Sequence, residues 1–181
     1  MRTKETKLFC FAELSDEAKA KVLDAKRDSI ENDPEDFTLI ESMESIQKIA
    51  SALGIRVKNW HVGPYNRSNH IDVDCDDCGN KALARFLRVL LEHGYSRPKT
   101  FKAMKFPGVC GFTGVCFDED VCEAIWEGLL DGDTLGKCFD HAGDRIARIA
   151  EDDLEYRQTD GSILEYLDKT DEIYDEDGNE F

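Results

Sequence analysis

Two cysteines have the spacing of metal ligands. Cys75 and Cys78 form a Cys-x-x-Cys pair, and His61 and His70 precede them in the chain. Such side chains hold structural zinc, but a structural zinc site usually shows a second close pair, and the two histidines are nine residues apart. We therefore expect no metal and no other cofactor. A small zinc-binding structural protein that uses Cys75 and Cys78 stays open as an alternative.

No sequence pattern for catalysis stands out. The chain contains no G-x-S-x-G, no H-E-x-x-H and neither common form of glycine-rich phosphate loop. Its four histidines are scattered, and its 39 acidic residues are too numerous for a pair of carboxylates to mark a site. We expect a protein that is not an enzyme.

The distribution of charge indicates a binding function. Residues 1–107 carry 17 acidic and 18 basic side chains, whereas residues 108–181 carry 22 acidic and 5 basic ones, within a net charge of −16. Apolar residues recur among these acids, so the carboxylates should lie on a folded surface. A surface with this density of negative charge resembles duplex DNA and would compete for the basic groove of a nucleic-acid-binding protein.

Eight carboxylates near the C-terminal end are the predicted partner-binding residues. They are Asp152, Asp153, Glu155, Asp171, Glu172, Asp175, Glu176 and Asp177. Their oxygens would accept hydrogen bonds from Lys and Arg of the partner, including the arginines that read a PAM if the partner is a CRISPR nuclease. A well-solvated acidic surface without a specific partner is the plainer interpretation and also stays open.

One basic stretch supports a further alternative, a nucleic-acid-binding module. Residues 81–107 hold seven basic side chains and one acidic side chain, with Tyr95, Phe101 and Phe106 between some of them. The seven are Lys81, Arg85, Arg88, Arg97, Lys99, Lys102 and Lys105. Cationic and aromatic side chains together bind single-stranded nucleic acids. Direct nucleic-acid contact is the less favoured interpretation, because the chain as a whole is acidic.

Hydrophobic periodicity predicts an α+β fold with about six helices and a small, mostly antiparallel sheet. Helices are expected from residue 16 to about 30, from 34 to 53, from about 80 to 93, from 118 to about 130, from about 135 to 149, and from 162 to 169. Strands are expected at 7–11, 55–62 and 70–74, with a hairpin at 173–181. We expect one domain, 1–181, either undivided or split into a near-neutral part, 1–107, and an acidic helical part, 108–181.

Particular residues should set the ends of these elements. Ser15 is the expected N-cap of the first helix, and Asp33 with Pro34 should open the second. Asp118 should cap the fourth helix. Ser162-x-x-Glu165 has the pattern of a capping box, and Asp177-Gly178 has that of a hairpin turn.

Several short segments resemble a loose family of small acidic phage and prophage proteins. They are FAELSDEAKAK (11–21), IASALGI (49–55), GVCFD (114–118), DLEYR (153–157) and EIYDEDG (172–178). These segments consist of helix caps and turns, so the resemblance carries over no active-site residue. It implies an origin in a mobile element and a role as an inhibitor of host defence, of the anti-CRISPR type.

Composition also bears on the compartment. No apolar run approaches the ~18 residues of a spanning helix, and the first residues lack the apolar stretch of a signal peptide. Seven cysteines, an odd number, argue against a secreted disulfide framework and favour reduced thiols. We expect a protein of the host cytoplasm without membrane contact.

Overall fold

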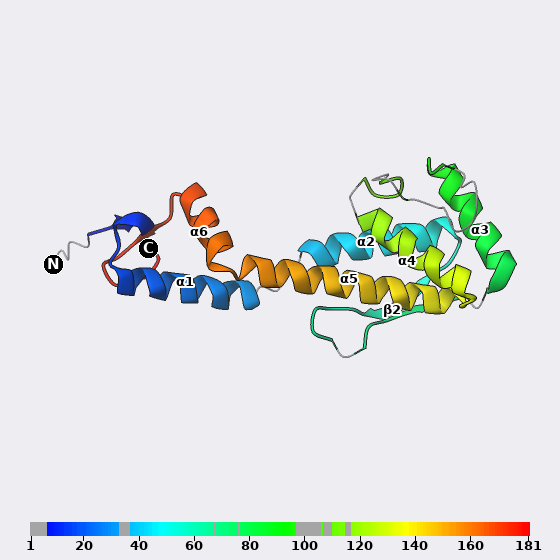
Figure 1. Cartoon of the computed structure of the whole chain (residues 1–181), viewed down its shortest axis with the longest axis horizontal. Coiled ribbons are helices and arrows are strands. Elements are labelled where there is room, and N and C mark those ends of the chain that lie inside the picture. The colour runs from blue at the N-terminus through cyan, green and yellow to red at the C-terminus, as the bar shows by residue number, and fades with distance from the viewer. Residues whose placement is uncertain are drawn as a thin grey trace, which may run out of the picture. The chain divides into compact units, whose positions relative to one another are not determined.

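The computed structural model describes residues 7–32, 37–66, 68–75, 77–96, 106, 110–114 and 117–181. The chain divides into two compact units (Figure 1). Unit 1 consists of residues 1–34 and 152–181, and unit 2 consists of residues 35–151. The two units therefore do not meet between residues 107 and 108, where the charge of the sequence changes.

Each unit contains both helices and strands. Unit 1 contains β1 (Phe9–Cys10), the 3-10 helix η1 (Phe11–Glu13), α1 (Asp16–Glu31), α6 (Asp160–Lys169) and β4 (Ile173–Tyr174). Unit 2 contains α2 (Phe37–Ala52), β2 (Val57–His61), β3 (His70–Val73), α3 (Gly79–Glu92) and α4 (Phe117–Asp131). Helix α5 (Leu135–Arg157) has residues 135–151 in unit 2 and residues 152–157 in unit 1.

The predicted α+β class is confirmed. The described residues form six α-helices, but their strands make two separate antiparallel sheets of two strands each instead of one sheet. Strand β1 pairs with β4, with Phe9 opposite Tyr174, and β2 pairs with β3, with His61 opposite His70. The first pairing joins the beginning of the sequence to its end and makes unit 1 discontinuous along the chain.

Unit 1 is built around a small apolar core. Ser15 caps α1 as predicted, since its side-chain oxygen accepts a hydrogen bond from the backbone N–H of Ala18 at 3.2 Å. The sparse apolar face of α1 then packs with α6 and β4. The buried side chains are Leu14, Ala18, Val22, Ile163, Leu167 and Tyr174. Six buried side chains are few for a unit of this size, so other interactions must contribute to its stability.

The turn after β4 requires glycine. The N–H of Gly178 donates to the carbonyl of Asp175 at 3.1 Å, and the N–H of Asp175 donates to the carbonyl of Asn179 at 3.0 Å. Gly178 has φ +77°, and a Cβ atom there would lie 2.7 Å from the carbonyl oxygen of Ala18. The predicted Asp-Gly turn is therefore confirmed, and the chain returns through a single bridge between Tyr174 and Glu180.

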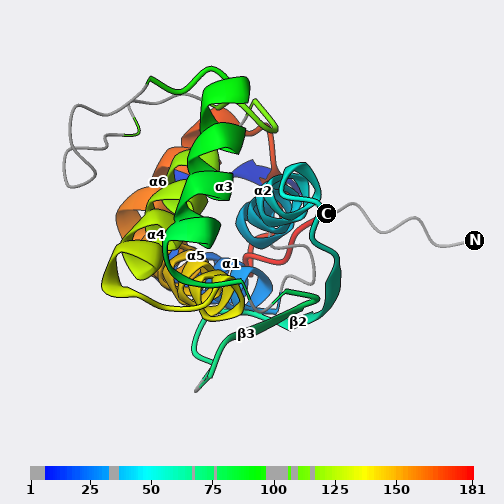
Figure 2. The same cartoon turned by 90° about the vertical axis from the view of Figure 1, so that its right-hand side faces the viewer.

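Unit 2 has the larger core. Figure 2 shows its four helices, α2, α3, α4 and most of α5, with the β2–β3 hairpin below them. Fully buried side chains come from each helix and from β3, and include Ile46, Ile71, Phe86, Ile125, Phe139 and Ile146. Gly94, at φ +90°, follows the end of α3, as its position in the sequence predicts.

Two cap predictions are wrong. Asp118 lies inside the first turn of α4, fully buried, and its carboxylate accepts hydrogen bonds from the N–H groups of Phe112 and Thr113 at 2.8 and 2.9 Å and from the Thr113 hydroxyl at 2.9 Å. It therefore fixes the preceding loop. Ser162 lies within α6, whose N-cap is Thr159. The predicted opening of α2 at Asp33 and Pro34 lies outside the described residues.

Candidate functional site: the carboxylates of unit 1

Unit 1 is the more acidic of the two units. Its 64 residues carry 20 acidic and 9 basic side chains, whereas the 117 residues of unit 2 carry 19 and 14. The C-terminal segment causes this excess, since residues 152–181 carry 12 acidic and 2 basic side chains, whereas residues 1–34 carry 8 and 7. All eight predicted partner-binding carboxylates belong to unit 1, so their individual environments decide which of them a partner could reach.

Glu172 is an internal residue. Its carboxylate accepts hydrogen bonds from the ammonium of Lys26 at 2.9 Å and from the hydroxyls of Tyr166 and Tyr174 at 3.0 and 2.5 Å. Burial alone would raise the pKa of Glu172, but these hydrogen bonds outweigh it and hold that pKa below its ordinary value. Lys26 also pairs with Glu180 at 3.1 Å. The oxygens of Glu172 therefore join α1, α6 and β4, and its role in partner binding stays a prediction.

Asp175 and Asp153 also have structural partners. Asp175 accepts hydrogen bonds from the N–H groups of Asp177 and Asn179 at 3.0 and 2.9 Å, which closes the turn after β4. The hydrogen bonds from Asn179 lower the pKa of Asp175. Asp153 forms an ion pair with Arg157, one helical turn later, at 2.9 Å. Both carboxylates therefore support the local fold of unit 1, and their role in partner binding stays a prediction.

The other five predicted carboxylates are displayed to solvent. They are Asp152, Glu155, Asp171, Glu176 and Asp177, all exposed. Within the described residues, their side-chain oxygens make no hydrogen bond or ion pair. Asp152 and Glu155 are three residues apart on α5 and share one face of that helix. The carbonyl oxygen of Asp177 accepts a hydrogen bond from Lys21 of α1 at 3.1 Å. This contact fixes the backbone that carries Glu176 and Asp177.

Helix α1 adds carboxylates that the sequence reasoning missed. A hollow of about 320 Å³ is lined by Glu17, Glu176 and Asp177 together with Ser15, Ala18 and Lys21. Glu17 and its neighbour Asp16 lie in the first turn of α1, where negative charge also stabilises the helix. No local sequence pattern predicts this cluster, because it forms only when the C-terminal segment packs against α1.

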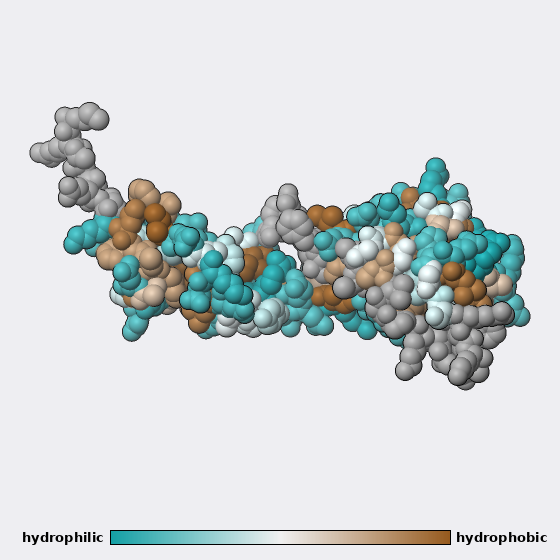
Figure 3. All heavy atoms as spheres, turned by 90° about the horizontal axis from the view of Figure 1, so that it is seen from above, coloured by the Kyte–Doolittle hydropathy of each residue, from teal (hydrophilic) through white to brown (hydrophobic). Residues whose placement is uncertain are grey.

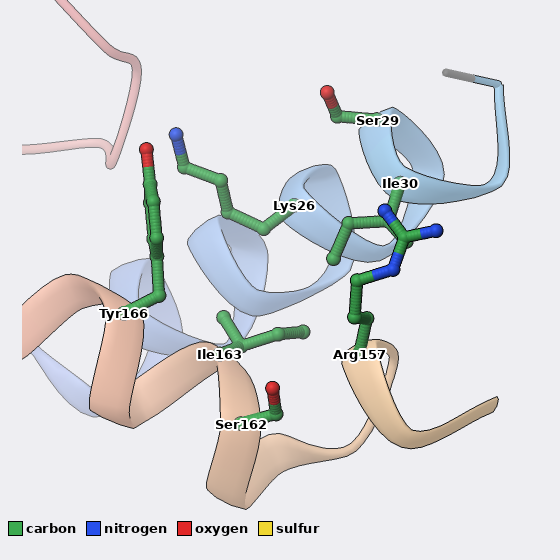
Figure 4. A pocket seen from close by; sticks show the side chains of 7 residues that line it. All are labelled: Lys26, Ser29, Ile30, Arg157, Ser162, Ile163 and Tyr166. Carbon is green, nitrogen blue, oxygen red and sulfur yellow. The ribbon is translucent and has the colours of Figure 1, made fainter. Parts of the chain in front are cut away.

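A second hollow in unit 1 has a mixed lining. It measures about 390 Å³ and is lined by Lys26, Ser29, Ile30, Arg157, Ser162, Ile163 and Tyr166 (Figure 4). Ile30 and Ile163 give it an apolar floor, and the charged ends of Lys26 and Arg157 lie near its rim. Both cations already pair with carboxylates, Lys26 with Glu172 and Arg157 with Asp153. An anion would therefore have to compete with those acids for them.

Apolar side chains accompany the exposed acids. In unit 1, Tyr156, Leu164, Tyr166 and Phe181 are between 42% and 76% exposed. Figure 3 shows hydrophobic residues among hydrophilic ones on the visible surface. Aromatic side chains near charged ones are common where proteins bind one another, because they supply contact area that charge alone does not.

The basic stretch of unit 2 is partly neutralised. Lys81 and Arg85 both pair with Asp77, at 3.0 and 2.8 Å, and Arg85 also donates to the carbonyl of Leu53. The hydrogen bond from Lys81, followed by those from Arg85, lowers the pKa of Asp77. Arg88 lies 3.9 Å from Glu92. The remaining candidates, Arg97, Lys99, Lys102 and Lys105, lie outside the described residues. Arg85 therefore joins Asp77 to the carbonyl of Leu53, and its role in nucleic-acid binding stays a prediction.

The two metal candidates stand apart from other ligands. Cys75 is half-buried, with its Sγ 3.8 Å from Arg85 Nη1, and Cys78 is exposed; both are free thiols. His61 and His70 face each other across β2 and β3, a proximity that their separation in sequence concealed. Among the described residues, no three His, Cys, Asp or Glu side chains gather as metal ligands.

Histidine–carboxylate pairs in unit 2 fasten its elements. Asp140 of α5 accepts a hydrogen bond from the N–H of Ile71 at 2.8 Å and lies 2.8 Å from His70 Nδ1. His141 Nε2 lies 2.9 Å from Asp133, just before α5. The first pair attaches the β2–β3 hairpin to α5, and the second holds the start of that helix. Neither pair has a Ser or Cys nucleophile bonded to its histidine among the described residues.

Comparisons with known proteins do not extend this description. No protein-family model matches the chain, and neither curated proteins nor solved structures yield a significant match. Among the described helices, none combines the length and the apolar character needed to cross a membrane.

Proposed function

We propose that this chain is a non-enzymatic binding protein whose unit 1 presents carboxylates to a cationic surface of another macromolecule. The observation that carries the proposal is the display of Asp152, Glu155, Asp171, Glu176 and Asp177 on an ordered backbone without partners in the described part of the chain. An exposed carboxylate that is already held in position loses little conformational freedom when an arginine or lysine binds it.

The internal carboxylates support this proposal indirectly. Glu172 holds the C-terminal segment against α1 and Asp175 closes the turn after β4, so the exposed acids keep fixed relative positions within unit 1. A fixed array of charges can match the spacing of cations in a groove, whereas a flexible acidic tail would pay for its ordering on binding.

The finer proposal concerns the partner. A row of carboxylates resembles nucleic-acid phosphates in charge, so the partner is a nucleic-acid-handling protein with an arginine- and lysine-rich groove. Together with the resemblance to small phage proteins, this supports a host defence nuclease, such as a CRISPR nuclease, as the proposed target, which the chain would inhibit by occupying the groove.

A pair of charge-matched variants tests the proposal. The first neutralises unit 1 with Asp152→Asn, Glu155→Gln and Asp171→Asn. The second neutralises unit 2 with Glu41→Gln, Glu44→Gln and Asp131→Asn, all exposed and without a hydrogen bond or ion pair in the described residues. Because both variants lose three negative charges, a difference between them reports on position and not on net charge.

The assay uses the immobilised chain in a bacterial lysate, followed by elution with short duplex DNA. We expect DNA to elute a nucleic-acid-binding protein from the wild type and from the unit 2 variant, with retention by the unit 1 variant reduced about tenfold. Purified Cas9–guide RNA complex then serves as a defined target in a DNA cleavage assay. Equal behaviour of the two variants, or no protein that duplex DNA displaces, would contradict the proposal. Cas9 activity unaffected by the chain would exclude that nuclease as the target.

A further inference from the structure

Strand β2 of unit 2 has one edge without a partner. It pairs with β3 on one side, and no third strand joins this sheet in the described residues. Of its five residues only Val57 is half-buried, and the other four are exposed. Strand β3, by contrast, has Ile71 and Val73 in the core. Within the described residues, the outer edge of β2 therefore has no partner strand, and its outward backbone N–H and C=O groups can pair with another strand.

A groove runs along this edge. It has a volume of about 480 Å³ and is lined by Gln47 and Ser51 of α2 and by Ile55, Arg56, Val57, Lys58 and Trp60. Four of these residues are consecutive, 55–58. Because successive side chains of an extended chain point to opposite faces, a hollow lined by consecutive residues lies beside the backbone and not over one face. The groove is thus bounded by a helix on one side and by an open strand edge on the other.

The lining has a charge opposite to that of the protein. Arg56 and Lys58 are exposed, and none of the seven lining residues is acidic. Arg56 has no ion pair within the described residues. Lys58 pairs with Asp74 at 3.3 Å, but both side chains are exposed to solvent, so this ion pair contributes little to stability. Trp60, 41% exposed at the end of the groove, supplies an indole surface for an apolar contact.

We infer that this groove binds an extended acidic peptide segment of a partner protein, which adds to β2 as a third strand. Backbone hydrogen bonds to the edge would give affinity, and carboxylates of the peptide would meet Arg56 and Lys58. Five residues of β2 span roughly 17 Å, enough to pair with a strand of similar length. The positive charge of Lys58 on this edge disfavours pairing with cationic strands, so the edge selects acidic ones.

Two other occupants fit the groove less well. A nucleic acid would offer phosphates to Arg56 and Lys58, but it has no row of alternating donors and acceptors for a strand edge, and a net charge of −16 repels it. A second copy paired through its own β2 would bring like charges of the two strands together. Both remain outcomes that the experiment distinguishes.

The test begins with a display library of random ten-residue peptides selected on the full chain. We expect the enriched peptides to be acidic and free of proline at alternate positions. The best peptide, labelled with a fluorophore, should bind Arg56→Glu/Lys58→Glu about tenfold more weakly than the wild type. The control Arg88→Glu/Arg148→Glu makes the same change in charge on exposed residues of unit 2 outside the groove, and its affinity should change less than about twofold.

Two further measurements separate strand addition from attraction between charges alone. Methylation of alternate amide nitrogens of the peptide should abolish binding, and a peptide with Lys in place of its acidic residues should bind Arg56→Glu/Lys58→Glu. Enrichment of non-acidic peptides, binding that survives both registers of methylation, or equal losses in the two variants would overturn the inference. So would binding of an oligonucleotide, or self-association lost in Arg56→Glu/Lys58→Glu, without peptide binding. The unit 1 proposal is tested by other residues, so either can fail alone.

Discussion

The two units achieve stability by different means. In the described residues, the main cluster of unit 2 contains 27 buried apolar side chains, whereas that of unit 1 contains six. Unit 1 compensates with polar contacts: Lys26 with Glu172 and Glu180, and Lys21 with the backbone of Asp177 and the side chain of Asn179. Hydrogen-bonded ion pairs contribute less than a packed core and depend on pH.

This difference suggests a division of roles. A large apolar core tolerates a groove on its surface without loss of order, and unit 2 carries the proposed peptide groove. A unit held by charged contacts can carry a dense acidic surface only where its own lysines and arginines offset part of the repulsion, as in unit 1. Hydrogen exchange can measure the stability of each unit separately.

The largest effect is expected in the core of unit 2. Phe139 is fully buried on α5, and Phe139→Ala should destabilise the protein by about 3–5 kcal/mol, because it removes a ring from a packed environment. Urea unfolding measures the loss, and amides of unit 2 should lose protection. Leu130→Ala, at a position 39% exposed, serves as the control with a small effect. A loss below about 1 kcal/mol for Phe139→Ala would contradict the assigned core.

A smaller effect is expected at the turn of unit 1. Gly178→Ala should cost about 2–3 kcal/mol, since the added Cβ meets the carbonyl of Ala18 and φ is positive. Exchange should accelerate in unit 1 and not in unit 2. Gly161→Ala is the matched control, because no atom lies within 4 Å of its Cβ position and alanine favours a helix. Equal effects of the two changes would refute the close approach of the turn to α1.

The carboxylate network makes unit 1 sensitive to acid. Glu172 has a lowered pKa in the folded chain, so its contribution is present above its ordinary value of 4.5 and is lost as pH falls through the folded pKa. Glu172→Gln should cost about 1–1.5 kcal/mol at neutral pH and flatten the acid dependence of unit 1. The exposed Glu155→Gln should leave that dependence unchanged. Unfolding of both units at the same acidic pH, with no effect of Glu172→Gln, would argue against the network.

The smallest effect is expected at the cap of α6. The side chain of Thr159 accepts a hydrogen bond from the N–H of Ser162 at 3.2 Å, and Thr159→Ala should cost about 0.5–1 kcal/mol in unit 1. Thr159→Ser keeps the hydroxyl and should restore most of this loss. If Ser162→Ala were the more damaging change, Ser162 would be the cap after all. Denaturant titration with hydrogen exchange resolves the difference.

Local signals predicted the helices well. The cap at Ser15, the long apolar periodicity of α2 and the glycine after α3 depend on neighbours within a few residues, so sequence patterns reveal them. The pairing of β1 with β4 could not be predicted in this way, because two-residue strands carry almost no periodicity and their partners lie at opposite ends of the sequence.

The candidate site shows the same limit. Sequence reasoning found the acidic segment but could not distinguish exposed Asp171 from internal Glu172, its neighbour. The difference arises from Lys26 and two tyrosines that fold onto Glu172 from other elements. Asp118 was also misassigned, because a carboxylate that begins a helix and one that fixes the preceding loop look alike in sequence.

The discontinuity of unit 1 has a consequence for biosynthesis. Residues 35–151 form a continuous insertion, so they can fold before residues 152–181 have left the ribosome. Helix α1 precedes the insertion in the sequence, but its core is complete only when α6 and β4 have been added. Folding of the insertion shortens the effective loop between these distant segments and lowers the entropy lost in joining them. The acidic surface of unit 1 is therefore complete only when α6 and β4 have joined α1, and in a chain truncated before residue 160 only residues 35–151 should resist proteolysis.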